Sequence, residues 1–174
     1  ALLAVGAGHS VYSNSLTGNR MVSNGLAGIL VHAIGTASGS AAASNAGSNS
    51  IVENFIASNG PDAIAGATTP TGVSVYGDSP VLDLIIYGNT FATETVDVFF
   101  NSASFLNIYS NDLVGTTGLV NQNPAGVVNA RENYWGCAYV TAPGTGGCSA
   151  IIGPNITYIP WLTASINQTP ATTT

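Results

Sequence analysis

Apolar residues alternate with more polar ones in short runs, and the same run recurs along the chain. The stretches IIYGNTF, NIYSNDL and NARENYW align at a spacing of 22 residues around Asn89, Asn111 and Asn133. The apolar positions lie three and five residues before each asparagine, as Leu84 and Ile86 do before the first. This period of two predicts a strand with one buried face in every repeat.

Two upstream stretches fit the same frame if insertions are allowed, SVYSNSL around Asn14 and IVENFI around Asn54. A second apolar run follows each asparagine after a short turn, in GILVHA (28–33), GVSVYG (72–77), VDVFFN (96–101) and GLVNQN (118–123). Gly, Asn and Ser separate the runs, as expected for turns. A period of about 22 residues with strand-like runs and no helical pattern predicts a solenoid.

The sequence therefore predicts an all-β fold, a right-handed parallel β-helix of about five turns. The expected organisation is β-helix turns over 1–136 with loops at 35–49 and 59–71, a C-terminal cap and extended segment over 137–165, and a Thr/Pro tail or linker over 166–174. Stacked turns place equivalent side chains about 4.8 Å apart. The inward asparagines are then expected to form a structural amide ladder, made of Asn54, Asn89, Asn111 and Asn133.

An outward column is expected two residues before each asparagine, and it contains Tyr12, Val52, Tyr87, Tyr109 and Arg131. Tyr87 and Tyr109 are expected to stack on an exposed face. One interpretation is a stacking ladder that stabilises the sheet. The other is an aromatic platform that contacts a glycan or a neighbouring subunit.

The most specific motif closes the chain, where NYWG (133–136) is followed by a Gly/Pro-rich excursion (137–154) and by YIPWL (158–162). This order resembles the last turn of the right-handed parallel β-helix repeat superfamily, the pectate-lyase-like solenoids. The resemblance covers the C-terminal part most specifically and extends over residues 8–162. It implies the fold and leaves the activity open, because such solenoids serve lyases, hydrolases, epimerases, adhesins and structural proteins.

A solenoid leaves an open apolar core at its end, which large aromatic side chains can close. Tyr134, Trp135 and Trp161 are therefore expected to form the C-terminal cap. A tryptophan that stacks on a sugar is the alternative. The amino-terminal stretch ALLAVGAGHSVY shows no comparable cap, so a preceding domain or another subunit is expected to cover that end.

Charged residues make up only 6% of the chain, lysine is absent and the formal net charge is -6. Nucleic acid and anionic membrane surfaces are therefore not expected partners, since both need clustered Lys and Arg. No apolar run reaches the roughly 20 residues that span a bilayer. A surface wetted by Asn, Ser, Thr and Gly is typical of extracellular or cell-surface proteins.

Two cysteines, Cys137 and Cys148, flank the Gly/Pro-rich stretch AYVTAPGTGG and are expected to form a disulfide, which indicates an oxidising compartment. A metal site is the competing interpretation, but no histidine lies nearby. Two sequons, at Asn155 and Asn167, are candidate glycosylation sites.

No catalytic constellation is expected, because glycoside hydrolases need paired carboxylates and lyases need carboxylates with a base. In the predicted outward column, Asp97 has no acidic neighbour, and His9 and His32 are isolated. No cofactor is expected. A calcium site is a further hypothesis for the acidic residues of two neighbouring turns, Asp78, Asp83, Glu94 and Asp97.

These observations favour a non-enzymatic extracellular β-solenoid that is a structural or adhesive component of a cell surface or filament. Its expected partner is another copy of itself or a polysaccharide. The alternatives are a fragment of a polysaccharide lyase, hydrolase or epimerase, and a carbohydrate-binding module.

Overall fold

The computed structural model describes residues 1–6, 8–35, 45–79, 81–137 and 142–167, and in these residues the protein is all β, with no helix. Its strands pair in parallel and form four sheets, here named A to D. This confirms the predicted all-β class with parallel pairing. The described part of the chain contains no helix long and apolar enough to cross a membrane.

Two large sheets of six strands make up most of the protein. Sheet A contains β1 (Leu2–Val5), β5 (Ile29–Ile34), β9 (Thr71–Gly77), β13 (Val96–Ser102), β15 (Thr117–Asn121) and β17 (Ala150–Ile152). Sheet C contains β3 (Ser15–Thr17), β7 (Ser50–Val52), β11 (Leu84–Tyr87), β14 (Phe105–Tyr109), β16 (Val127–Asn129) and β18 (Ile156–Thr157). In both sheets the strands follow one another in chain order.

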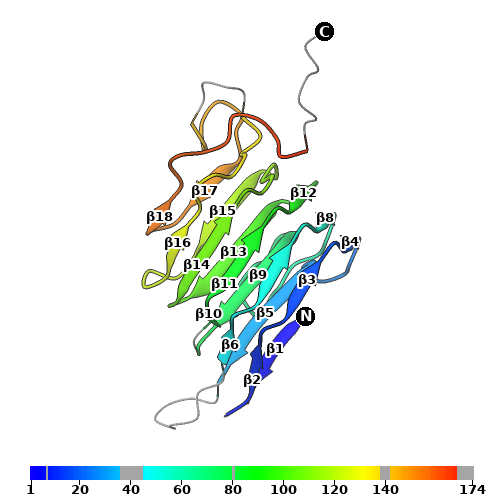
Figure 1. Ribbon diagram of the computed structural model, residues 1–174, viewed down its shortest axis with the longest axis vertical. Coiled ribbons are helices and arrows are strands. Elements are labelled where there is room, and N and C mark those ends of the chain that lie inside the picture. The colour runs from blue at the N-terminus through cyan, green and yellow to red at the C-terminus, as the bar shows by residue number, and fades with distance from the viewer. Residues whose placement is uncertain (7, 36–44, 80, 138–141, 168–174) are drawn as a thin grey trace.

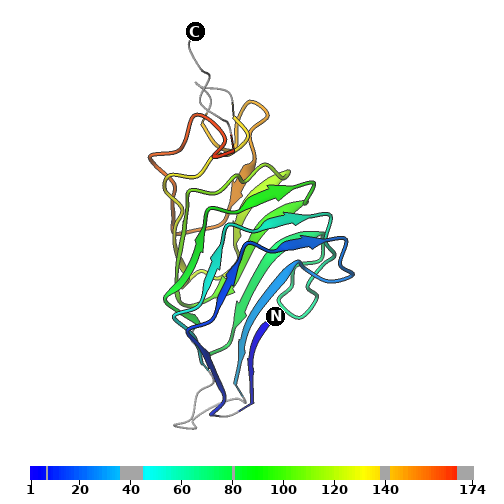
Figure 2. The same ribbon diagram turned by 45° about the vertical axis from the view of Figure 1, so that its right-hand side comes forward.

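Two smaller sheets of three strands lie between them along the chain. Sheet B contains β2 (Ser10–Tyr12), β6 (Asn45–Gly47) and β10 (Val81–Leu82), and sheet D contains β4 (Arg20–Val22), β8 (Phe55–Ala57) and β12 (Thr90–Ala92). The chain visits the sheets in the order A, B, C, D three times and then alternates between A and C. Figures 1 and 2 show the resulting stack, from blue strands at one end to orange strands at the other.

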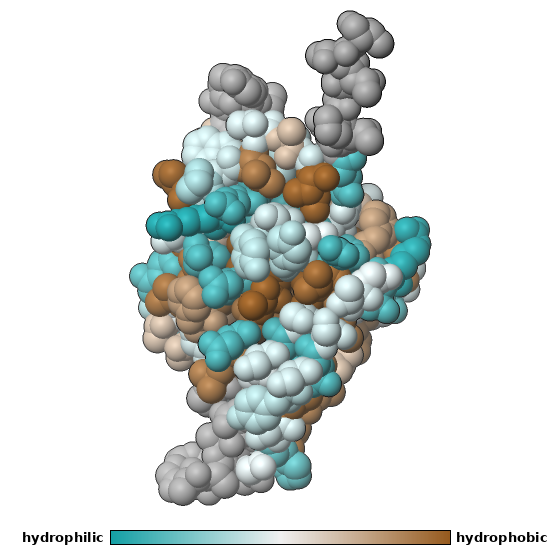
Figure 3. Space-filling model, in the orientation of Figure 1, coloured by the Kyte–Doolittle hydropathy of each residue, from teal (hydrophilic) through white to brown (hydrophobic). Residues whose placement is uncertain are grey.

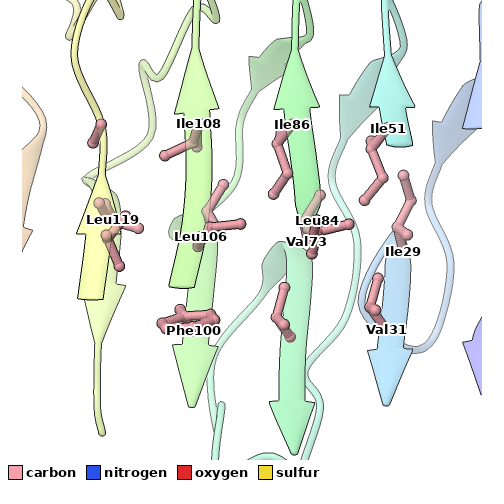
Figure 4. Packing of buried hydrophobic residues seen from close by; sticks show 14 of the residues in the cluster. Ile29, Val31, Ile51, Val73, Leu84, Ile86, Phe100, Leu106, Ile108 and Leu119 are labelled. Atoms are coloured by element: carbon pink, nitrogen blue, oxygen red, sulfur yellow. The ribbon is translucent and has the colours of Figure 1, made fainter. Parts of the chain in front are cut away.

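The core lies between the sheets and consists of columns of aliphatic side chains (Figure 4). Ile51, Ile86 and Ile108 occupy matching positions on adjacent strands of sheet C, and all three are fully buried. Burial of each such side chain stabilises the fold by about 1.5–3 kcal/mol. On sheet A, Val75 and Phe100 form a matching buried pair.

The structure corrects three details of the predicted frame. Strand β6 lies inside the stretch 35–49 that was expected to be a loop, while residues 36–44 of that stretch lie outside the described residues. On sheet A, Ser74 is paired with Phe99 and not with Asp97, a shift of two residues. In the asparagine frame, the partner of Asn54 in the first passage of the chain is Asn19, and not Asn14.

The connection between β8 and β9 folds onto the outer surface of sheet A. It is closed by an antiparallel bridge between Asp62 and Ala67, and Asn101 of β13 donates a hydrogen bond to the carbonyl of Ala65. Ala65 and Ala67 pack with Val96 and Phe99 in a second, smaller cluster. This connection therefore covers outward side chains that an uncovered sheet would expose.

The C-terminal segment passes over the last strands and returns along sheet D. Trp135 is fully buried in the main core, whereas Trp161 is partly buried and packs against it. Further on, Asp112 accepts hydrogen bonds from Ser165 Oγ, from the backbone N–H of Ile166 and from Asn167 Nδ2. These bonds fasten the segment to the body of the protein.

The predicted disulfide between Cys137 and Cys148 is present and closes a loop with a sequence separation of 11. Because the bond restricts the unfolded chain, we expect its reduction to lower the free energy of unfolding by about 2–3 kcal/mol. Urea unfolding with and without a thiol reductant measures this difference. Equal midpoints in the two conditions, with reduction verified by thiol titration, would show that the loop is held by its other contacts.

Candidate functional site

An asparagine ladder runs through the interior beside sheet C. Its rungs are Asn19, Asn54, Asn89, Asn111 and Asn133. The Oδ1 atom of each rung above the first accepts two bonds from the rung before it, one from the backbone N–H and one from Nδ2. Between Asn89 and Asn111 these two distances are 2.8 and 3.0 Å. The upper four rungs are buried, so these bonds satisfy polar groups that water does not reach.

Two shorter ladders repeat the arrangement at other corners of the chain. Asn14 donates to Asn49, and Asn24 donates to Asn59, which in turn donates to Glu94. The sequence signal for all three ladders is the motif of three asparagines at five-residue spacing, which occurs at 14, 19 and 24 and again at 49, 54 and 59. The alignment of the chain at a 22-residue spacing did not reveal this motif.

The residue before each rung has a positive φ, which turns the chain sharply and directs the next side chain inward. Glu53, Gly88 and Glu132 show this conformation before Asn54, Asn89 and Asn133. Thr93, with φ 59, shows it before Glu94. Glu94 therefore occupies a true ladder position although it is not an asparagine.

The outer face of sheet C contains the predicted tyrosine pair. Tyr87 and Tyr109 are paired residues of β11 and β14, with ring centroids 5.0 Å apart and ring planes at 44°. Tyr87 is 37% exposed. Beside them, Asn129 Nδ2 donates to Asn107 Oδ1 at 3.1 Å, in a column that also contains Ile85 between Ser50 and Asn107. We call Tyr87, Tyr109, Asn107 and Asn129 the tyrosine face.

The neighbours of the tyrosine face differ in part from the predicted column. Val52 is the partner of Tyr87 as expected, and Thr17 precedes it in the position assigned to Tyr12. Tyr12 lies on sheet B, where it is paired with Gly47 and its ring lies close to that glycine. The tyrosine stack is therefore limited to two rings.

His32 is not isolated, in contrast to the prediction. Its Nε2 atom lies 2.6 Å from Oδ2 of Asp62, which belongs to the connection between β8 and β9, and both residues are 3% exposed. The ring of Tyr76 packs edge-on against the imidazole, with centroids 5.8 Å apart. Ser74, on the same strand as Tyr76, is buried and its Oγ has no hydrogen-bond partner. This enclosed pair fastens the connection to sheet A.

Asp97 is the second of the charged residues whose environment differs from the prediction, because it is fully buried. Its Oδ2 accepts the N–H of Gly115 at 2.8 Å, and its Oδ1 has no partner. Burial raises the pKa of Asp97 well above its usual value, the bond from Gly115 opposes the rise, and the charge of Glu94 adds to it. Burial also raises the pKa of Glu94, against the effect of its hydrogen bonds from Asn59.

The acidic residues of the calcium hypothesis do not form one cluster. Asp78 accepts the N–H of Gly35, and Asp83 precedes β11, whereas Glu94 and Asp97 lie after β12. In the described ranges, no group of three or more His, Cys, Asp or Glu side chains is placed to hold a metal ion.

The predicted cap and glycosylation residues have distinct environments. The indole of Trp135 is fully buried and inaccessible to a sugar, Tyr134 is half-buried, and Trp161 lies 6.3 Å from the ring of Tyr158. Asn155 is exposed and its Nδ2 donates to the carbonyl of Pro124 at 2.9 Å. Asn167 Nδ2 donates to Asp112, and Thr169 of that sequon lies outside the described residues.

Comparison of the chain with protein-family models, with curated proteins and with solved structures gives no match. No family is therefore assigned, and membership of the pectate-lyase-like superfamily stays a prediction from the C-terminal motifs. The tyrosine face is the candidate contact site, and the enclosed acidic residues are the candidate titrating site.

Proposed function

We propose that the chain is a right-handed parallel β-helix of about five turns that acts outside the cell as a non-enzymatic structural or adhesive element. The tyrosine face is its contact surface, toward a second copy or a polysaccharide. The disulfide supports an oxidising, extracellular location. The resemblance of the C-terminal segment to pectate-lyase-like solenoids supports the handedness, and the repeated runs and stacked parallel strands support the turn count.

The observation that carries this proposal is the stacked pair of Tyr87, which is exposed, and Tyr109, which is partly exposed, on the outer face of sheet C. Ser, Thr and Asn side chains lie on that surface, as in the 3.0 Å contact between Ser50 and Ser15, and Ile85 interrupts their column. Hydroxyl, amide and phenol groups of this kind bind neutral hydroxyl-rich partners and other uncharged protein surfaces. Figure 3 shows one side of the molecule, on which small polar residues are interspersed with apolar ones.

The buried acid and base groups support a contact function over catalysis. His32 and Asp62 are enclosed, and so are Glu94 and Asp97, whereas a hydrolase needs two carboxylates that reach the substrate. A shallow pocket beside β8 and β12 is lined by Glu53, Phe55 and Thr90, with a single carboxylate. This pocket lacks the acid pair that glycoside hydrolysis requires.

Electron microscopy of the purified protein over a concentration series tests self-association, and a polysaccharide panel tests adhesion. We expect filaments, sheets or retention on at least one polysaccharide, without release of reducing or unsaturated sugars. Sugar release would contradict a non-enzymatic role. Uniform single particles together with no retention would contradict both forms of contact.

The Tyr87→Ala variant locates the contact surface. Because Tyr87 is exposed, we expect its unfolding free energy to change by about 1 kcal/mol or less, while association or retention weakens about tenfold. Tyr12→Ala is the matched control, since Tyr12 is also an exposed tyrosine but lies on sheet B. Equal losses in the two variants would place the contact elsewhere.

A further inference from the structure

Every buried ladder asparagine both accepts and donates hydrogen bonds. Its Oδ1 accepts from the rung before it, and its Nδ2 donates to the carbonyl three residues before that rung. Asn54 donates in this way to Leu16, Asn59 to Met21 and Asn111 to Ile86. A side chain in a ladder position therefore lies beside two kinds of group, both from the preceding turn of the chain. These are the N–H donors of the preceding rung and a backbone carbonyl that accepts a hydrogen bond.

Glu94 takes the ladder position that follows Asn59. It accepts the N–H of Asn59 at 3.2 Å and the Nδ2 of Asn59 at 2.7 Å, and it is 4% exposed. An ionised carboxylate has no proton to donate, whereas a neutral carboxylic acid has one donor and keeps acceptor capacity. Only the neutral form of Glu94 has the donor that the amide provides at the other rungs.

Asp97 lies three residues further on, with no exposed surface and one oxygen without a partner. A Cβ placed on Gly115 would lie 2.5 Å from that Oδ1 and 2.9 Å from the carbonyl oxygen of Glu94, so the backbone closes over both residues. Burial of an ionised carboxylate with a free oxygen is costly. Protonation removes this cost.

The groups that face the two acids do not provide a compensating cation. Asn59 and Gly115 contribute N–H groups, while Phe91 and Gly72 pack beside the backbone of Asp97. Both arginines, Arg20 and Arg131, are exposed, and Arg20 lies over the ring of Phe55. In the part of the chain that the structure describes, the only ion pair joins His32 to Asp62.

We propose that Glu94 and Asp97 form an interior proton-binding pair that makes the folded protein most stable in acidic surroundings. The site lies where the chain leaves sheet D for the last time, with Glu94 between β12 and β13 and Asp97 as the second residue of β13. As the pH rises, ionisation of the pair places two negative charges in the interior at this corner. The corner between β12 and the connection through Gly115 is then the first part of the fold to open.

The sign of the pH dependence follows from the raised pKa of both carboxyls. The stabilisation is complete below the pKa values of the unfolded chain and is lost as the pH rises through the higher folded values. This is opposite to the behaviour of carboxylates that are stabilised by ion pairs, which lose stability in acid.

Urea unfolding between about pH 5 and about pH 8 tests the pair in the wild type, in Asp97→Asn, in Glu94→Gln and in the double variant. For the wild type, we expect the unfolding equilibrium constant to rise about tenfold or more over this interval. In the double variant, whose amides are neutral, the rise is at most half as large on a logarithmic scale. Asp78→Asn is the control, since Asp78 is exposed, and it is expected to keep the wild-type slope.

A spectroscopic measurement keeps the test independent of how the variants fold. Infrared spectra of folded wild-type protein labelled with 13C-aspartate are expected to show a protonated carboxyl band that persists above the pH at which free aspartate ionises. Absence of that band, or equal pH slopes in the wild type and the double variant, would overturn the proposal. Neither result depends on the contact function of the tyrosine face.

Discussion

Replacement of Asn111 by alanine is expected to lower the free energy of unfolding by about 3–5 kcal/mol. Asn111 is fully buried, and its Oδ1 accepts both ladder bonds from Asn89. Its Nδ2 donates to Asn133 Oδ1 and to the carbonyl of Ile86. The variant removes these four bonds and leaves the backbone N–H of Asn89 without its acceptor in the interior, while Asn89 Nδ2 and Asn133 Oδ1 keep other bonds. A buried polar group that loses its partner costs about 1–3 kcal/mol. Urea unfolding measures the loss.

Asn14→Ala is the matched control for Asn111→Ala. Asn14 is an exposed end of a ladder and donates to Asn49 without receiving a bond from a preceding rung. Water replaces its partners, so the expected loss is about 1 kcal/mol or less. A similar loss in both variants would show that the interior ladder is no more stabilising than a surface hydrogen bond.

Trp135→Ala is expected to cost about 3–5 kcal/mol, because it leaves a cavity at the end of the core. The indole is fully buried and lies so close to Gly118 that a Cβ there would be 2.8 Å from two ring carbons. Leu113 contributes to the same contact region. Thermal unfolding monitored by circular dichroism measures the loss of stability. Light scattering in the same experiment shows whether the opened end of the core causes aggregation.

Two comparison variants, Trp161→Ala and Trp135→Phe, are expected to lose less stability than Trp135→Ala. Trp161 is only partly buried, so its truncation is expected to cost less than half as much as that of Trp135. Phenylalanine retains most of the apolar volume, and the loss is expected to be intermediate. A Trp135→Ala protein with the wild-type melting temperature would remove the capping role.

The strands of the large sheets were predictable because their apolar alternation reflects burial directly. The runs around Ile86 and Ile108 and the second runs of sheet A all correspond to observed strands. The disulfide was predictable because the two cysteines flank a stretch rich in glycine and proline. Parallel pairing followed from the repeat, since equivalent strands of successive repeats run in the same direction.

The small sheets were not predicted, because their strands have only two or three residues, too few to show an alternating pattern of their own. Strand β6 consists of Asn45, Ala46 and Gly47 within a low-complexity stretch, where composition favours a loop. The 22-residue spacing was also misleading in the first part of the chain, where ladder rungs are 35 residues apart. The tyrosine pair was predictable because Tyr87 and Tyr109 lie on adjacent strands of the region in which the 22-residue repeat is regular.

The environment of the charged residues was the least predictable feature. Alternation placed Asp97 outward with Leu30 and Ser74, but the strand pairing on sheet A differs by two residues at this point. His32 meets Asp62 only because a connection folds back over the sheet. A carboxyl group is accommodated in such an interior through hydrogen bonds and protonation, which leave no periodic trace in the sequence.

The central ladder continues without change where the rung spacing falls from 35 to 22 residues. The backbone-to-side-chain bonds are 2.9 Å from Asn54 to Asn89 and 2.8 Å from Asn89 to Asn111. The difference of 13 residues, 35 minus 22, has two parts. The path from Ala57 to Val73 is 16 residues long where that from Ala92 to Val98 is 6, and the path from Gly77 to Leu84 through sheet B is 7 where that from Ser102 to Leu106 is 4. The cross-section of the protein can therefore differ from turn to turn. A coil of 35 residues can be followed by one of 22 residues at a ladder rung without a break in the ladder. An engineered chain in which one wide coil is shortened by these 13 residues should keep the spacing between successive turns and have a smaller cross-section at that turn.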